Sequence, residues 1–161
     1  MYNNVKTRMP IPLNNKLDYY VLIAGSRTIT NAGVIENFIR EDLNRLDIKD
    51  DKYNIIIVTG GASGVDTIAE HFADKNNYGK IIMYAEWGKY GNSAGFIRNE
   101  QMHKYISKKN HRIVLCFKDK YSTGMGTTHS IELGKKYKNN VIFHTVDFEE
   151  MIDHVDKYTN E

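Results

Sequence analysis

The sequence contains very little cysteine and proline. Cys116 is the single cysteine among 161 residues, which excludes a disulfide within the chain. It lies in the apolar run IVLCF, so we expect a buried and inert thiol. Both prolines, Pro10 and Pro12, lie in residues 1–16, which we interpret as an extended or frayed N-terminal arm ahead of a single domain over residues 17–161. A lone thiol fits a reducing compartment, and we expect a cytoplasmic protein.

Long apolar runs and a strong charge bias are also missing. No window approaches the ~18 consecutive apolar residues of a membrane-spanning helix, and the N-terminus has no apolar core of a secretion signal. The 22 Lys and Arg residues are interspersed with 20 Asp and Glu, giving a formal net charge of +2. The densest basic stretch, residues 104–112, is typical of a solvated helix end. These features predict a soluble protein with no membrane partner, and they disfavour nucleic acid as a partner.

Several motifs of known chemistry are absent from the sequence. The chain has neither the lysine-bearing loop of P-loop nucleotide hydrolases nor the strict GxGxxG of dinucleotide-binding folds. It has no cysteine cluster and no spaced set of histidines that would hold a metal. We therefore predict no metal site and assign no cofactor. His129, a lone histidine beside a glycine-bearing loop, is interpreted as a polar surface group rather than a catalyst.

The sequence does contain five short apolar runs, which alternate with segments of helical length. The runs are continuous rather than alternating, as expected for strands buried on both faces of a sheet. Repeated strand–helix–strand units predict an α/β fold, namely a Rossmann-like three-layer domain with a parallel five-stranded sheet in the order 3-2-1-4-5. The expected strands are residues 19–24, 54–59, 80–84, 112–117 and 141–145.

Helical periodicity and capping residues locate the helices. The first is expected over residues 31–46, and the second begins almost at Gly64. The remaining signals are caps: Ser93 for a third helix that runs to about Lys109, Thr127 or Thr128 for a fourth, and Asp147 for a last helix that ends near Val155.

Three glycine-bearing loops, each directly after an apolar run, are the most informative feature. Such loops expose backbone N–H groups where helices begin, and these groups can hold an anion such as a phosphate. Arg27, directly after the first strand, can form paired hydrogen bonds with a phosphate or a carboxylate. The candidate ligand-binding residues in these loops are Gly25, Ser26 and Arg27, then Gly60, Gly61, Ser63, Gly64 and Asp66, and finally Gly124, Gly126, Thr127 and Thr128.

Three further candidates follow the third strand. Arg98 shares a helix stripe with Met102 and Tyr105, so its guanidinium is expected to point inward, where it needs an anionic partner. The neighbouring Asn99 is either a second polar contact or a surface residue. Trp87 either stacks on the base of a ligand or covers the core.

Two interpretations are equally open for Asp66. In the first, Ser63 is the N-cap of the second helix and Asp66 is the acid three residues later that completes a capping box. Alternatively, it accepts hydrogen bonds from a ribose.

The motifs GSR, GGASGVDTIAEHFA, EWGKYGNSAGFIRNEQM and GMGTTHSIELG, in this order, resemble the SLOG superfamily over about residues 19–138. Within it they are similar to the YspA-like branch of uncharacterised bacterial and phage proteins. The resemblance implies a Rossmann-like fold that binds nucleotides or nucleotide-derived molecules. Relatives include the LOG phosphoribohydrolases, the DNA-processing protein DprA, and sensor domains for cyclic ADP-ribose-type signals in antiphage defence. The resemblance implies that the pocket is lined by Gly25, Ser26, Arg27, Gly60, Gly61, Gly64, Asp66, Arg98, Asn99, Gly126 and Thr127.

One departure from the LOG pattern bears on catalysis. The LOG enzymes carry PGGxGTxxE, and Ser130 stands where that glutamate belongs. Glu132 lies two residues farther on, about 200° around the helix. We therefore expect a protein that senses or sequesters a nucleotide-derived ligand, a defence signal among the candidates, without efficient turnover. No catalytic residue is assigned. The alternative is an N-glycosidic hydrolase that uses Asp66, Glu86 or Glu132, and a single-strand DNA binder is the least favoured reading. The resemblance also implies a homodimer or higher homo-oligomer.

Overall fold

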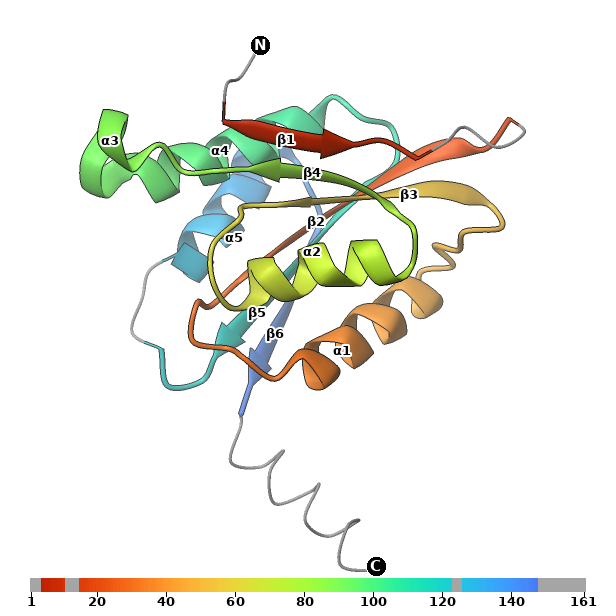
Figure 1. The fold of residues 1–161 in the computed structure, drawn as a ribbon, viewed down its shortest axis with the longest axis horizontal. Helices are drawn as coiled ribbons and strands as arrows, with labels where there is room; N and C mark the ends of the chain where they lie inside the picture. Colours follow the sequence, from red (N-terminus) through yellow and green to blue (C-terminus); the bar gives the residue numbers. More distant parts are fainter. Residues whose placement is uncertain (1–3, 11–14, 123–125, 148–161) are drawn as a thin grey trace, which may run out of the picture.

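A computed structural model describes residues 4–10, 15–122 and 126–147 of the chain (Figure 1). Its strands form one mixed six-stranded sheet in the order β1-β4-β3-β2-β5-β6. The strands are β1 Val5–Arg8, β2 Leu17–Gly25, β3 Tyr53–Thr59, β4 Gly79–Met83, β5 Arg112–Asp119 and β6 Val141–Val146. The helices are α1 Ala32–Arg45, α2 Val65–Lys75, α3 Trp87–Tyr90, α4 Ala94–Ser107 and α5 Gly126–Tyr137, with a 3₁₀ turn η1 at Gly91–Ser93.

The predicted five-stranded, fully parallel sheet is wrong, because β1 adds a sixth strand that runs antiparallel to β4. The five predicted strands are present, and they pair in parallel in the order β4-β3-β2-β5-β6. Strand β1, with the sequence VKTR, contains no apolar run from which a strand could be predicted. Instead, part of the expected N-terminal arm forms an edge strand whose register pairs Val5 with Met83 and Arg8 with Lys80.

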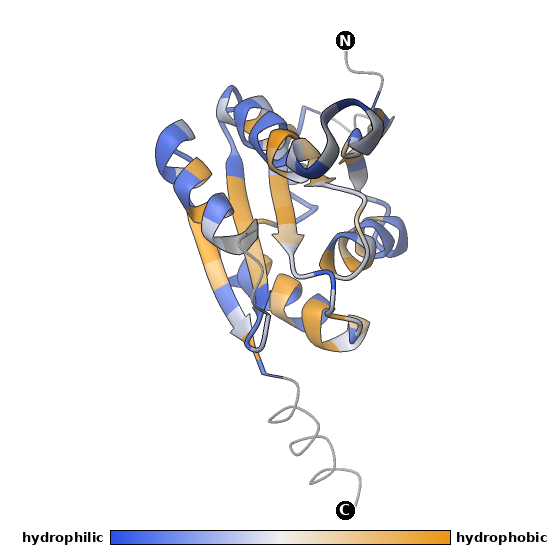
Figure 2. Ribbon diagram, turned by 90° about the vertical axis from the view of Figure 1, so that its left-hand side faces the viewer, coloured by the Kyte–Doolittle hydropathy of each residue, from blue (hydrophilic) through white to orange (hydrophobic). Residues whose placement is uncertain are grey.

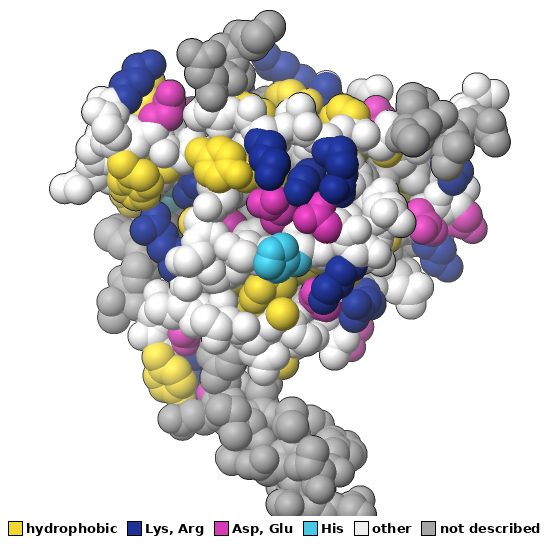
Figure 3. All heavy atoms as spheres, in the orientation of Figure 1, with side chains coloured by type: hydrophobic (Ala, Val, Ile, Leu, Met, Phe, Trp, Pro, Cys, Tyr) yellow, Lys and Arg dark blue, Asp and Glu magenta, His cyan; other side chains and the backbone are white. Residues whose placement is uncertain are grey.

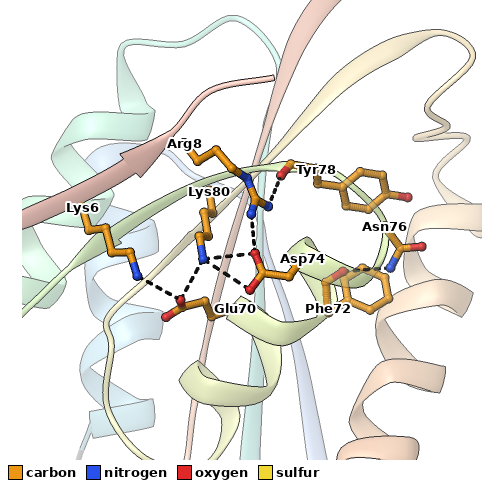
Figure 4. Close-up of polar contacts among 8 residues, drawn as sticks. All are labelled: Lys6, Arg8, Glu70, Phe72, Asp74, Asn76, Tyr78 and Lys80. Atoms are coloured by element: carbon orange, nitrogen blue, oxygen red, sulfur yellow. Dashed lines mark hydrogen bonds and ion pairs between the residues drawn. The ribbon is translucent and has the colours of Figure 1, made fainter. Parts of the chain in front are cut away.

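Ion pairs with the neighbouring helix α2 hold β1 in place (Figure 4). Lys80, on β4, is buried and reaches Glu70 at 2.9 Å and Asp74 at 3.0 Å. Arg8 of β1 contacts Asp74 at 2.6 Å, and Lys6 lies 3.7 Å from Glu70. Figure 3 shows acidic side chains lying between basic ones over this part of the surface. The strand is therefore stabilised by contacts with residues more than 60 positions away, which no local pattern records.

Helices cover both faces of the sheet, so the domain has three layers. On one face, Val21 and Ile23 of β2 pack with Ile35 of α1 and Phe72 of α2. On the other face, Leu22 of β2 belongs to a second cluster that includes Met102 and Ile106 of α4. Hydrophobic residues accordingly follow the strands between the two helical layers (Figure 2). The expectation of strands buried on both faces is confirmed for β2, β3, β4 and β5, whereas β6, at the edge of the sheet, is only partly buried.

The helix starts differ in detail from those predicted. Gly64, not Ser63, is the N-cap of α2, and its φ of 76° is one that glycine tolerates best. Ser93 is the N-cap of α4, but its side chain makes no capping hydrogen bond. Helix α5 begins at Gly126, so Thr127 and Thr128 lie inside its first turn rather than before it.

Two further expectations concern the last predicted helix and membrane-spanning segments. The last predicted helix lies almost wholly outside the described residues. Within the described ranges, none of the helices has the length and apolar character to cross a bilayer.

Candidate functional site

The loops that follow β2, β3 and β4 meet at one end of the sheet, on the left in Figure 1. This is the edge formed by the carboxyl ends of the parallel strands, where open α/β sheets place their ligands. Ser26 ties three of the elements together there. Its hydroxyl accepts a hydrogen bond from the Asp119 N–H at 2.9 Å, and its carbonyl accepts one from the Val65 N–H at 3.3 Å. The first glycine loop is thus fixed to the end of β5 and to the start of α2.

Two adjoining cavities open at this edge. The main cavity has a volume of about 320 Å³, and the side cavity has a volume of about 250 Å³. Of the predicted binding residues, seven line the main cavity: Gly25, Ser26, Arg27, Asp66, Trp87, Arg98 and Asn99. The side cavity is lined by Gly60, Gly61 and Ser63, and it shares Arg27, Trp87 and Arg98 with the main cavity. The structure therefore brings together residues from three separate loops and a helix.

Some predicted residues lie elsewhere. Gly64 and the exposed Thr128 are absent from the lining of both cavities. Gly124 lies outside the described residues, and for Gly126 and Thr127 only the backbone is described. Of the carboxylates considered for catalysis, Asp66 lines the main cavity, whereas Glu86 and the exposed Glu132 line neither cavity.

Arg98 is the central cation of the site. It lies on α4, is only 7% exposed, and lines both cavities. Its Nη1 donates a hydrogen bond to the Gly60 carbonyl, and its Nε donates one to Oδ1 of Asn99 at 2.9 Å. Among the described residues it has no ion-pair partner, and burial lowers its pKa from the ordinary value. The inward direction predicted for this guanidinium is confirmed, and its expected anionic partner is not supplied by a direct ion pair.

Asp66, on the first turn of α2, is the buried carboxylate of the site. Its side chain is 5% exposed and accepts a hydrogen bond from the Ala62 N–H at 3.2 Å. Burial raises the pKa of this carboxyl, while the charge of Arg98 and the Ala62 N–H act in the opposite direction. Asp66 lies two residues after the N-cap Gly64, and its bond with the Ala62 N–H closes the turn that follows β3.

Two glycines give the loops their close packing. A β-carbon at Gly60 would lie 2.6 Å from Nη1 of Arg98 and 2.8 Å from Oδ2 of Asp66. At Gly64 it would collide with the Ser26 carbonyl oxygen. Both glycines therefore make room for protein groups.

The outer wall of both cavities is formed by Arg27 and Trp87. The Arg27 guanidinium carbon lies 5.2 Å from the centre of the Trp87 ring, a cation–π distance. Trp87 is 48% exposed, so it does not cover the core. The two side chains come from the loop after β2 and from α3, and their contact joins these two segments at the mouth of the site.

Two residues outside the predicted binding set complete the main cavity. Cys116 and Ser130 form part of its lining, and both are buried. Burial raises the pKa of the Cys116 thiol to about 12, in agreement with an inert thiol. Cys116 lies on β5 and Ser130 on α5. The signal for Cys116 was its closeness to a glycine-bearing loop, and the signal for Ser130 was its position in place of the glutamate of the LOG pattern. His129 is half-buried and meets Phe96 edge-on, with ring centres 4.7 Å apart.

Comparisons with known proteins found one family model that matches part of the chain. Residues 19–90 match the model of the YspA, cpYpsA-related SLOG family. The "Gene 61 protein" of Mycobacterium phage D29 is 31% identical over 87 residues, which cover 51% of this chain and 66% of the phage protein. An uncharacterized protein from Bacillus cereus ATCC 10987, known from a crystal structure, aligns with a TM-score of 0.31 and 12% identity over 96% of this chain and 64% of its own. The chain thus spans slightly less than two thirds of each of these relatives.

Proposed function

Because residues 19–90 belong to the YspA, cpYpsA-related SLOG family, we propose that the main cavity binds a nucleotide or nucleotide-derived ligand. The proposal assigns the protein a sensing or sequestering role, without efficient turnover. Family membership supports the nucleotide-related class of ligand. The geometry of the cavity supports the anionic character of that ligand and names the residues that would contact it.

The observation that carries the proposal is the burial of Arg98. A cation that is only 7% exposed is costly unless an opposite charge or several hydrogen bonds compensate for it. The protein supplies one carbonyl and one amide oxygen, from Gly60 and Asn99. Asp66 acts on Arg98 through its charge but forms no direct ion pair with it, so an anionic group in the cavity, which Arg98 lines, would supply the direct partner.

The position of the cavity favours the same ligand. It lies at the carboxyl edge of the parallel strands, beside β2. From β2 the chain first adds β3 and β4 on one side and then β5 and β6 on the other, and ligands of Rossmann-like folds bind at such a switch point. Arg27 at the mouth can bind a second oxygen of a phosphate, and Trp87 offers a ring face for a base. Asn99 and Ser130 offer polar groups for a sugar.

A single observation favours the N-glycosidic hydrolase as a second candidate. Asp66 is buried beside the cavity, and its pKa is raised, which is the condition for a carboxyl that acts as a general acid near neutral pH. Glycoside hydrolysis ordinarily needs two carboxylates, however. Asp66 is the one carboxylate that the described lining of the main cavity contains, and it is already bound to the Ala62 N–H. This arrangement supports binding over turnover.

Calorimetric titration with the common 5′-nucleoside mono- and diphosphates tests the proposal. We expect at least one to bind the wild-type protein, with the bound ligand recovered intact after denaturation. Chromatography of the same mixtures tests the second candidate, since an enzyme that turns over at ~1 per second would release free base within minutes. Release of base that Asp66→Asn abolishes would establish the hydrolase. Absence of binding by the whole panel would contradict the proposed class of ligand.

A further inference from the structure

The two cavities share a boundary that contains their positive charge. Arg27, Ala62, Trp87 and Arg98 line both cavities. Among the described lining residues, Arg27 and Arg98 are the only cations of either cavity. An anionic group is therefore attracted to the junction of the two cavities and not to the far end of either.

The side cavity is too small to serve as a separate ligand site. Its volume of about 250 Å³ lies below the ~300–1,000 Å³ of ordinary ligand pockets, and the main cavity, at about 320 Å³, lies at the lower end. Taken together, the two reach well into that range. Their sizes indicate one ligand that occupies both.

The walls of the two cavities have different chemistry. Apart from the residues shared with the main cavity, the side cavity is lined by Gly60, Gly61, Ser63, Tyr84 and Ala85, with no charged side chain in the described lining. The main cavity instead offers the polar groups of Asn99 and Asp66. An uncharged, planar group fits the former, and a hydroxyl-bearing group fits the latter.

We propose that the ligand is a phosphate ester substituted on both sides, with the phosphate between Arg27 and Arg98 and one organic group in each cavity. This inference rests on the proposed function, because it concerns the same site. A nucleoside with a terminal phosphate would leave the side cavity unfilled. A phosphodiester or a pyrophosphate that links two nucleosides would fill both cavities and place its negative charge at the junction.

Matched pairs of ligands test the proposal by calorimetry. The monophosphates AMP, GMP, CMP and UMP are compared with the dinucleoside phosphates ApA, GpG, CpC and UpU, and NAD represents the pyrophosphate-linked class. We expect the best doubly substituted compound to bind at least tenfold more tightly than the best monophosphate. Tighter binding of NAD would assign a pyrophosphate, and tighter binding of a dinucleoside phosphate would assign a diester. Monophosphates that bind equally well or better would overturn this inference while leaving the proposed function intact, and no binding by any compound would overturn both.

A variant that fills only the side cavity provides the second test. Ala85 lines the side cavity but not the main one, and Ala85→Phe would occupy it. We expect this change to weaken binding of the doubly substituted compound more than that of the monophosphate, and so to remove the preference between them. Ala32→Phe, at the exposed start of α1, is the matched control and should leave both affinities as in the wild type. A preference that survives Ala85→Phe in a folded protein contradicts the assignment of the second group to the side cavity. Should that variant not fold, the smaller Ala85→Val carries the same comparison.

Discussion

Arg98 of helix α4 donates a hydrogen bond to the carbonyl of Gly60, which lies 38 residues earlier in the chain. The bond fastens the glycine loop after β3 to the helix that follows α3, and it holds a buried cation at the boundary of two cavities. A β-carbon at this position would displace the guanidinium from its present place. The contact therefore links the shape of the loop to the charge of the site.

The first prediction concerns this arginine. Arg98→Lys keeps the charge but cannot serve both the Gly60 carbonyl and a ligand with the same geometry. We expect nucleotide affinity to fall about tenfold or more, because a charge-assisted hydrogen bond contributes roughly 1.5–3 kcal/mol. Calorimetric titration of the folded variant with nucleotide measures this loss of affinity. Arg40→Ala, which removes an exposed arginine of α1, is the control that should bind as the wild type does, and equal loss in both variants would argue against a specific role.

The second prediction uses Trp87, the single tryptophan of the chain, as an optical reporter. A bound anion would compete with the Trp87 ring for the Arg27 guanidinium. The contact between Arg27 and Trp87 should therefore change, and the Trp87 fluorescence should shift when ligand is added. Arg27→Ala should change the emission of the free protein and weaken the response to ligand. Arg40 lies over Phe72 at 5.7 Å in a comparable pair, and Arg40→Ala should leave the emission unchanged. A ligand that binds without altering the emission of the wild type would place its anion away from this pair.

The third prediction is acid sensitivity caused by His103. This imidazole is 1% exposed, and burial lowers its pKa to about 4 from an ordinary 6.5. The unfolded chain therefore binds a proton at higher pH than the folded protein, so stability falls as the pH drops from about 6.5 to about 4. The expected loss is about 3 kcal/mol, since each unit of pKa corresponds to about 1.4 kcal/mol. Urea unfolding at pH 7 and pH 4.5 should show a smaller difference for His103→Gln than for the wild type. An equal difference in the two proteins would assign the acid sensitivity to other groups.

The fourth prediction concerns the ion pairs that hold β1. Lys80→Met removes the buried cation shared by Glu70 and Asp74, and it leaves two carboxylates with only exposed partners. We expect a loss of about 1 kcal/mol in the free energy of unfolding, because Glu70 and Asp74 are partly exposed and keep Lys6 and Arg8 as partners. Lys104→Met, on the exposed face of α4, should change the stability by less than ~0.5 kcal/mol. Similar effects of the two changes would show that the network contributes little.

The fifth prediction is self-association, which the family resemblance implies. Large apolar side chains that are 38–48% exposed cluster in sequence around α3 and the start of α4, namely Trp87, Tyr90, Phe96 and Ile97. Exposed apolar groups of this kind mark interaction surfaces. We expect light scattering at micromolar concentration to give at least twice the monomer mass of 18.6 kDa, and Ile97→Ser to lower it. The monomer mass for the wild type would contradict the prediction.

The glycine loops show how far local sequence information reaches. An apolar run followed by a glycine-bearing loop and a helical stripe predicted that Gly25, Gly60 and Gly64 lie where strands end or helices begin, and the structure has them there. The same pattern could not give the reason for glycine at Gly60 or Gly64. That reason is the approach of Arg98 in one case and of the Ser26 carbonyl in the other, both contacts between distant segments.

The sequence by itself determined the five parallel strands, the limits of the main helices to within a few residues, and the inward direction of Arg98. Continuous apolar runs indicate buried strands, and apolar stripes with a period of 3.6 residues indicate helices and the faces they bury. Only the tertiary structure decided that Val5–Arg8 becomes an edge strand, that Cys116 and Ser130 line the main cavity, and that Arg27 and Trp87 meet at its mouth. Each of these depends on pairing and packing between segments far apart in the chain. Such contacts are set by the geometry of the whole sheet and leave no repeating pattern in the residues that make them.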